Sequence, residues 1–525
     1  MKVARQAVSQ PSDVDAALAA LGADDLREVV REAMGRLDER AHEAVAGAII
    51  RRAARGASGW APAAVSEREV AEAVAFAERA RQDGTADPSE VDERLGRGTA
   101  AFLRKDYAAA HRIYGALLPM LADGDVDLGQ DELVSEVLGV DTDACAAQYV
   151  VAAYMLAAPA ARADAVRAAI REVDGVGYFF EPIRDMERAA GEALPGLDDF
   201  LPRWRAVVEG EAAGGRRADR DTETDRWLRE VVGRMEGPAG LAAIARRSSR
   251  PDDLRAWCRS LVEATDWRAA LPAFEEAAEL AREAAPRAEF LDGAAFAAQR
   301  LGEADVSPWL ERAWRAEPTM ARLLRWLGRA GAAQAMQARI AEALAACPQE
   351  AQAQLALLRL LHGDVAGSAK LLAEAPGLGW SGRDHPGHQV FPLFAALLGC
   401  PASAAGPSEP GSDREPPEFE DDEGDRRIAT PPMDEIVRAA GVEGVRDPRS
   451  RALMLAAMRE AAEARVAGVT GQKRRRHYGH AASLVAACVA CDRSPETDRW
   501  VATLRGEYRR FPALREELDR RIGSA

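Results

Sequence analysis

Two stretches of this 525-residue sequence contain side chains of the types that bind transition metals in proteins. In the first, His477 and His480 precede Cys488 and Cys491, and each pair has the spacing of a zinc half-site. On one continuous helix, however, His480 and Cys488 lie roughly 12 Å apart along the axis at 1.5 Å per residue. Zinc bonds of about 2.0–2.3 Å cannot bridge that distance. We therefore interpret Cys488 and Cys491 mainly as packed thiols and retain them as weak metal candidates.

The second stretch is Asp384-His385-Pro386-Gly387-His388. Its two imidazoles and one carboxylate could bind a transition metal, although no fourth ligand lies nearby in the sequence. Alternatively, Pro386 begins a helix and a histidine donates a hydrogen bond to a backbone carbonyl while the following aromatic residues pack. We keep His385 and His388 as weak metal candidates and predict neither a metal nor a cofactor.

A basic run begins at Lys473 and includes Arg474, Arg475 and Arg476. Such a run could contact phosphates or an RNA base. At the start of a helix, three arginines oppose the helix dipole, so we expect a compensating acidic contact, from a partner or from residues 417–424 of this chain. The chain has 85 acidic and 69 basic residues and a net charge of −16, which disfavours general nucleic-acid binding. We predict that these arginines bind an acidic protein surface.

Other features of the sequence narrow the class of protein. It contains no P-loop, no dinucleotide-binding glycine motif, no nucleophile-elbow motif and no His-Glu-x-x-His pair, so we expect a protein that is not an enzyme. Neither a signal peptide nor a transmembrane segment is apparent. The cysteines at positions 145, 258, 347, 400, 488 and 491 are interpreted as reduced thiols. The bias toward Ala, Gly and Arg is typical of a bacterial protein, and we expect it to be cytoplasmic.

Helical hairpins provide the strongest pattern. Residues 254–280 read as two helices with a turn at Asp266-Trp267, and Ala270 is small enough for the helices to approach closely. Residues 98–118 repeat this pattern, with Gly98 at a close helix crossing and a turn at Asp106-Tyr107. Between residues 254 and 376, further turns are predicted at Gly302, Gly331 and Gly363-Asp364. Because a short hairpin cannot bury its own apolar face, such hairpins need stacked neighbours.

The two hairpins resemble degenerate tetratricopeptide repeats in their order of small residue, turn, alanine and aromatic residue. The spacing of the four turns after residue 254 is also close to the repeat length of about 34 residues. The resemblance implies a curved solenoid that binds a peptide or helix of a partner. Large or charged side chains at repeat positions are candidate contacts: Trp267, Phe274, Arg322, Arg325 and Arg329. We expect these three arginines to contact an acidic segment of the partner.

A second resemblance concerns the C-terminal region. The matching residues are Tyr478, Ala481, Leu484, Tyr508 and Pro512 among others, and they are similar to the helical tail of bacterial SWIM zinc-finger proteins. The Cys-x-Cys and Cys-x-His zinc motif of that family is absent. The resemblance implies a related bacterial scaffold without the finger.

These patterns predict five segments along the chain. The helix-forming composition and the lack of long runs of β-branched residues predict an all-α fold. The predicted segments are an N-terminal helical block (1–208) with a repeat-like hairpin (88–121), a flexible loop (209–224), a repeat solenoid (225–400), a disordered acidic linker (401–432) and a C-terminal helical block (433–525).

We therefore predict a non-catalytic scaffold that binds an unidentified protein partner on a helical-repeat surface. Two other classes remain open at this point. One is a nucleic-acid-associated bacterial regulator related to SWIM-type proteins, and the other is an all-α enzyme whose site is assembled from distant residues. A further possibility is that the acidic linker docks on the C-terminal block and regulates access.

Overall fold

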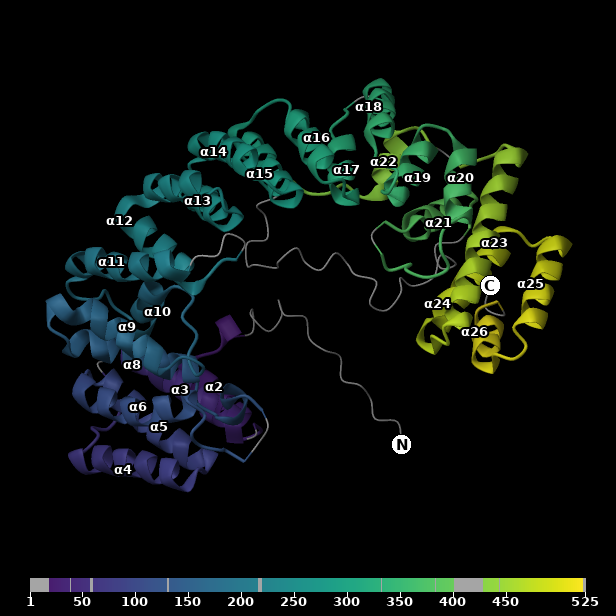
Figure 1. The fold of residues 1–525 in the computed structure, drawn as a ribbon. Coiled ribbons are helices and arrows are strands. Elements are labelled where there is room, and N and C mark those ends of the chain that lie inside the picture. Colours follow the sequence, from purple (N-terminus) through teal and green to yellow (C-terminus); the bar gives the residue numbers. More distant parts are fainter. Residues whose placement is uncertain are drawn as a thin grey trace. The chain divides into compact units, whose positions relative to one another are not determined.

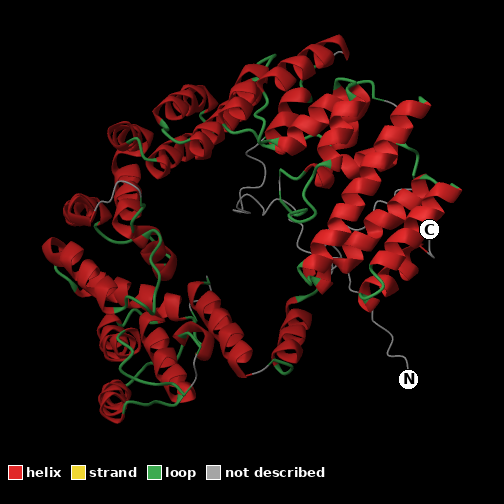
Figure 2. Ribbon diagram, turned by 45° about the vertical axis from the view of Figure 1, so that its right-hand side comes forward, coloured by secondary structure: helices red, strands yellow, loops and turns green. Residues whose placement is uncertain are grey.

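The fold is all-α, as predicted. A computed structural model describes residues 18–37, 39–56, 60–129, 132–215, 220–331, 333–382, 384–400, 428–442 and 444–522. Within these ranges helices are joined by loops, and no strand occurs (Figure 2). One isolated bridge pairs Thr85 with Asp127. No helix in the described ranges is both long enough and apolar enough to cross a membrane.

The chain divides into two compact units, residues 1–241 and 242–525. The helices of the first unit are α2 (Ala23–Met34), α3 (Glu39–Arg55), α4 (Glu67–Asp83), α5 (Pro88–Leu103), α6 (Tyr107–Ala122), α7 (Val134–Val137), α8 (Thr142–Leu156), η1 (Pro159–Ala161), α9 (Arg162–Glu172), α10 (Pro182–Ala190), α11 (Leu197–Gly215) and most of α12 (Glu223–Ser248) (Figure 1). Gly237, with φ of +61°, breaks α12 shortly before the division between the units.

The second unit contains the remaining helices. They are α13 (Pro251–Glu263), α14 (Trp267–Leu280), α15 (Ala284–Leu301), α16 (Ser307–Ala316), α17 (Met320–Leu327), α18 (Ala333–Ala346), α19 (Gln352–Leu361), α20 (Val365–Ala373), α21 (Pro386–Leu397), α22 (Met433–Ala439), α23 (Pro448–Gly471), η3 (Arg475–His477), α24 (Tyr478–Cys491), α25 (Pro495–Glu507) and α26 (Pro512–Ile522).

Three of the predicted hairpins have the same turn conformation. Asp106, Asp266 and Asp364 have nearly the same backbone angles, with φ of −82° to −84° and ψ of 72° or 73°. The residue before each has a positive φ of 53–89°. Each aspartate then accepts the backbone N–H three residues later, at 2.8–3.1 Å, and so caps the second helix. The predicted turns at Gly302 and Gly331 also lie between helices, where both glycines have positive φ.

In two places, between α5 and α6 and between α14 and α15, consecutive helices approach closely because a glycine faces an aromatic ring. A Cβ atom added at Gly98 of α5 would lie 2.7 Å from Cε1 of Tyr114 on α6. A Cβ atom at Gly293 of α15 would lie 2.4 Å from Cε1 of Phe274 on α14. The first of these contacts confirms the close crossing predicted at Gly98. The ring of Tyr114 is fully buried, and its hydroxyl bonds Gln148 of α8, which joins the hairpin to the next helix.

In the second unit, side chains connect alternate helices. Nε of Arg255 on α13 donates to Glu289 on α15 at 2.8 Å. Asp292, one turn further along α15, accepts from Nε of Arg322 on α17 at 2.7 Å. Helices α13, α15 and α17 are therefore neighbours in one row.

A second row consists of the intervening helices. The indole N–H of Trp309 on α16 donates to Glu275 on α14 at 2.8 Å. Arg315, also on α16, donates to Glu342 on α18 at 2.8 Å. From α13 to α18, consecutive helices thus alternate between two rows.

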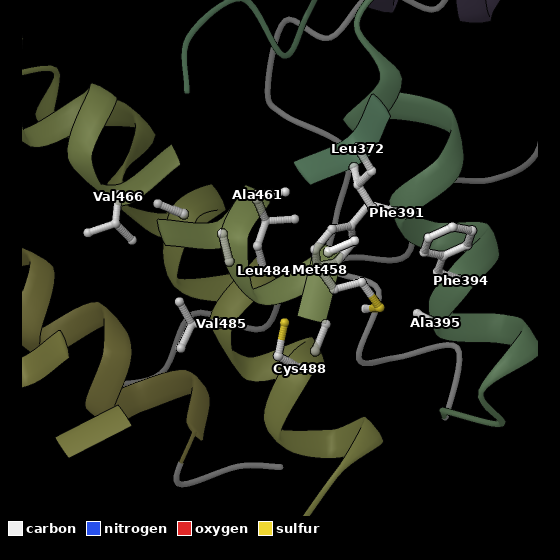
Figure 3. Packing of buried hydrophobic residues seen from close by; sticks show 14 of the residues in the cluster. Leu372, Phe391, Phe394, Ala395, Met458, Ala461, Val466, Leu484, Val485 and Cys488 are labelled. Carbon is white, nitrogen blue, oxygen red and sulfur yellow. The ribbon is translucent and has the colours of Figure 1, made fainter. Parts of the chain in front are cut away.

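The C-terminal helices share a core with α19, α20 and α21. Buried side chains from α21, α23 and α24 meet in this core, among them Phe391, Met458 and Leu484 (Figure 3). Contact extends to the backbone, because a Cβ atom added at Gly377, in the loop after α20, would lie 1.8 Å from the carbonyl oxygen of Ala464 on α23. The predicted C-terminal block therefore packs directly against the helices that precede residue 400.

Most of the predicted linker, residues 401–427, lies outside the described residues. Its last five residues are described, and three of them contact helices. Ile428 is buried in a core that includes α15, α16 and α17, and the hydroxyl of Thr430 accepts a hydrogen bond from Arg325 at 2.8 Å. Pro431 contacts α17 so closely that a Cβ atom at Gly328 would lie 2.8 Å from its Cγ.

The predicted flexible loop is also shorter than its composition indicates. We predicted a loop over residues 209–224, whereas α11 continues to Gly215 and α12 begins at Glu223. Glu211 is held in α11 by Arg167, which donates to its carboxylate at 2.8 Å. Residues 216–219 lie outside the described ranges.

A buried carboxylate caps a helix in the first unit. Glu230 of α12 accepts the backbone N–H groups of Ile183 at 3.1 Å and Arg184 at 2.8 Å. These groups belong to the first turn of α10, where N–H groups have no partner within the helix. Burial raises the pKa of Glu230 to about 7, although both hydrogen bonds favour the ionised form.

The contact between Gly98 and Tyr114 predicts a pair of opposite mutational effects on α5. Gly98→Ala should lower the free energy of unfolding by about 1–3 kcal/mol, because the new methyl group must displace a buried ring. Gly96→Ala, on the same helix, meets no atom within 4 Å and should raise it by roughly 0.5–1 kcal/mol. Urea denaturation followed by circular dichroism measures both. Equal effects of the two substitutions would contradict the close contact.

The raised pKa of Glu230 predicts a change of stability with pH. Its folded pKa of about 7 exceeds the value of about 4.3 for an unfolded chain, so the folded state binds the proton more tightly. The contribution of Glu230 to the free energy of unfolding is therefore largest below the unfolded pKa of about 4.3. It falls as the pH rises from there through the folded pKa of about 7. Glu230→Gln cannot ionise and should gain stability relative to the wild type between pH 4.5 and 8.

Urea titrations across this pH range test the prediction, with the exposed Glu223→Gln on the same helix as the control. The difference between Glu230→Gln and the wild type should change with pH, and the difference for Glu223→Gln should not. Parallel pH profiles for all three proteins would show that Glu230 does not titrate in this window.

Candidate partner-binding surface

An open cleft lies between three consecutive helices of the second unit. Its volume is about 460 Å³, within the range of about 300–1,000 Å³ that is usual for binding pockets. Helix α14 contributes Ala278 and Glu279, α15 contributes Arg287 and Leu291, and α16 contributes Arg312, Arg315 and Ala316.

The packing of the helices fixes the walls of this cleft. Phe274 fills the space over Gly293 and sets the distance between α14 and α15. Trp309 binds Glu275 and holds α16 against α14. Ala278 and Leu291 are almost completely buried at the bottom of the cleft, and the half-buried Ala316 adds accessible apolar surface to this floor. Glu279 and the three arginines are exposed and surround it.

The arginines of the cleft differ in their partners. Arg315 donates to Glu311 at 2.7 Å and to Glu342 at 2.8 Å, and the hydrogen bond with Glu311 raises the pKa of its guanidinium. Arg287 donates one hydrogen bond, to the carbonyl oxygen of Ala281 at 2.9 Å. Within the described part of the chain, neither Arg287 nor Arg312 forms an ion pair with a carboxylate. Two guanidinium groups at the cleft are therefore available to an anionic ligand.

The predicted aromatic contacts, Trp267 and Phe274, lie on α14 and pack mainly against α15. Trp267 is half-buried, and its ring meets Phe296 edge-on at 5.6 Å between centroids, with Arg300 over its face at 5.3 Å. Phe274 covers Gly293. Both side chains stabilise the helix pair, and Trp267 keeps some exposed surface.

The predicted arginine contacts on α17 have two different environments. Arg322 and Arg325 are buried, at 7% and 9% exposure. Burial acts to lower the pKa of Arg322, but the carboxylates of Asp292 and Glu317 outweigh it and raise the value. These intramolecular contacts do not favour a role of Arg322 or Arg325 in partner binding. Arg329, which follows α17, is exposed.

The basic run of the C-terminal region is exposed. Arg474, Arg475 and Arg476 precede α24, and Nε of Arg476 lies 3.0 Å from Nε2 of His477. Beneath them, burial and the nearby Arg465 lower the pKa of His480 to about 3. His480 is therefore neutral at physiological pH, and the positive charge of this region comes from Lys473 and the arginines.

The histidines of the second metal-like stretch hold the backbone. His385 caps α21 by accepting the N–H of Gly387 at Nδ1 (3.1 Å), and its Nε2 donates to the carbonyl oxygen of Pro376 at 2.8 Å. Pro386 is the first residue of α21, as in the non-metal alternative. Because both ring nitrogens of His385 bond backbone groups, neither is available to a metal. His388 is half-buried on the first turn of α21.

The cysteines correct one prediction. Cys400 and Cys491 form a disulfide across a sequence separation of 91, so the interpretation of all six as reduced thiols is wrong for these two. The bond joins the C-terminal ends of α21 and α24. Because its sulfur is in the disulfide, Cys491 has no thiolate to offer a metal. Cys145, Cys258, Cys347 and Cys488 are free and buried. Burial raises the pKa of Cys488, which keeps it protonated.

Within the described ranges, no group of three or more His, Cys, Asp or Glu residues is arranged to hold a metal ion. In the part of the chain that the structure describes, no such group contains the four metal candidates, which are His385, His388, Cys488 and Cys491.

Comparison with known proteins adds no functional assignment. No protein-family model matches the sequence, and no curated protein matches it.

The cleft was not predicted from the sequence. Arg312 and Arg315 are three residues apart, so they lie on one face of a helix, and that spacing was a usable signal. Arg287 comes from the preceding helix, and its proximity depends on how α15 packs against α16. Glu279 comes from a third helix.

The disulfide predicts a stability that depends on the redox conditions. Cys400→Ser should lower the free energy of unfolding by about 2–4 kcal/mol in the absence of reductant, because the unfolded chain loses a constraint that closes a long loop. Dithiothreitol should lower the free energy of unfolding of the wild type by a similar amount. It should not change the free energy of unfolding of Cys400→Ser. Urea denaturation followed by tryptophan fluorescence measures this. A wild type that does not respond to reductant would contradict the bond.

Proposed function

We propose that this protein is a non-catalytic scaffold that binds a peptide or helix of a partner protein. In this proposal, the helix pairs from α13 to α20 form a degenerate tetratricopeptide-like solenoid. The alternation of helices between two rows, bridged by Arg255–Glu289 and Arg315–Glu342, supports such stacking. Stacked helix pairs present one extended surface to a ligand, and binding is the usual work of such a surface.

The observation that carries the proposal is the cleft between α14, α15 and α16. Its apolar floor and exposed rim have the composition of a peptide-binding groove, in which apolar contacts supply affinity and polar groups fix orientation. Buried ionisable groups elsewhere serve the structure instead: Glu230 caps α10 and Arg322 bonds Asp292. The net charge of −16 also favours a protein partner over nucleic acid.

Selection of a random peptide library against the purified full chain tests this function. We expect enriched peptides to share a motif and to bind the chain with one-to-one stoichiometry in fluorescence anisotropy. Single-stranded RNA, used as the comparison ligand, should bind at least tenfold more weakly at the same salt concentration. Failure to enrich any motif, together with tight and salt-dependent RNA binding, would contradict the proposal and favour the regulator alternative.

A further inference from the structure

The charges around the α14–α16 cleft are unusual for this chain. The protein as a whole carries 16 more negative than positive charges, yet this cleft is surrounded by three arginines and one carboxylate. Arg315 is already neutralised by Glu311 and Glu342. The uncompensated positive charge at the rim therefore comes from Arg287 and Arg312, which lie on two neighbouring helices.

We propose that this cleft binds an acidic segment of a partner protein, with a carboxylate side chain between Arg287 and Arg312 and an adjacent apolar side chain on the floor. The inference rests on the proposed scaffold function and specifies its ligand. Guanidinium groups offer several N–H donors in a planar fork, which matches the two oxygens of a carboxylate.

The floor of the cleft distinguishes a peptide from a free anion. Ala316, the half-buried apolar residue of the cleft, gives an inorganic anion no interaction, but it can pack against an apolar side chain next to the acidic one. A partner segment that alternates acidic and apolar residues satisfies both parts of the cleft.

Glu279 makes the distribution of charge around the cleft asymmetric. It lies on the α14 side of the rim and is exposed, and it has no ion-pair partner among the described residues. An acidic residue of the ligand is repelled there and attracted on the α15–α16 side. The acidic part of the segment should therefore lie toward Arg287 and Arg312.

Fluorescence anisotropy with labelled ten-residue peptides tests this inference on the full chain. The probes are an alternating Leu-Glu peptide, the uncharged Leu-Gln peptide and the basic Leu-Lys peptide. We expect the Leu-Glu peptide to bind at least tenfold more tightly than either of the others, and its affinity to fall as salt is raised, because salt screens exposed charges.

Substitutions at the rim give the sharper test. The double variant Arg287→Glu/Arg312→Glu should weaken binding of the Leu-Glu peptide about tenfold or more, and Glu279→Gln should strengthen it about twofold to threefold. Arg268→Glu is the matched control. It reverses one positive charge on α14, which is half of the charge change in the double variant, roughly 15 Å from Ala278 along the helix axis, and should leave the affinity unchanged.

The outcomes separate this inference from the proposed function. If the random library yields a motif without acidic residues whose binding ignores the Arg287→Glu/Arg312→Glu change, the scaffold function stands and the acidic-ligand inference is overturned. If the Leu-Glu peptide binds only after the acidic residues of the 417–424 segment are replaced by their amides, the chain's own segment occupies the cleft and the partner assignment is overturned. If Arg268→Glu weakens binding as much as the rim variant, the attraction is not localised at the cleft.

Discussion

The contact of a glycine with an aromatic ring controls how closely two consecutive helices approach each other. Gly98 lies against Tyr114 in the first unit, and Gly293 lies against Phe274 in the second. A close approach lets each pair bury enough apolar surface, but only when a neighbouring helix covers the remaining face. The bridges from α13 to α15 and from α14 to α16 follow from this requirement. The cleft exists because α14, α15 and α16 are held in this register.

The turn between paired helices supports the same arrangement. Asp106, Asp266 and Asp364 cap their helices through similar backbone geometry, and each follows a residue with positive φ. Only Gly363 avoids steric strain in that conformation; Lys105 and Thr265 adopt it at a cost of about 1 kcal/mol or more. That cost shows that the helix pairing imposes the turn, since neither residue prefers it locally.

Local patterns in the sequence predicted the helices and their turns well. The all-α class, the hairpin at residues 88–121 and the turns at Asp266, Gly302, Gly331 and Gly363 depend on spacing and capping, which are local properties. Contacts between distant segments could not be predicted in this way. The Cys400–Cys491 disulfide, the docking of Thr430 on Arg325 and the shared core of α21 and α24 each join segments that are far apart in the sequence.

The same distinction explains the candidate site. Sequence reasoning selected Arg322 and Arg325 because they lie in an arginine-rich helix, but it could not show that Asp292 lies opposite them. It missed Arg287 and Arg312 because their proximity depends on the packing of two helices. An exposed position and a buried one look alike in a sequence when the helix has charged residues on more than one face.

The most direct test of this account is hydrogen–deuterium exchange of the full chain with and without a saturating peptide enriched from the random library. The account predicts slower exchange in residues 278–291 and 309–316, which form the cleft, and little change in residues 474–480. Protection confined to residues 474–480, or no protection in either region, would contradict the proposal that the cleft is the binding surface.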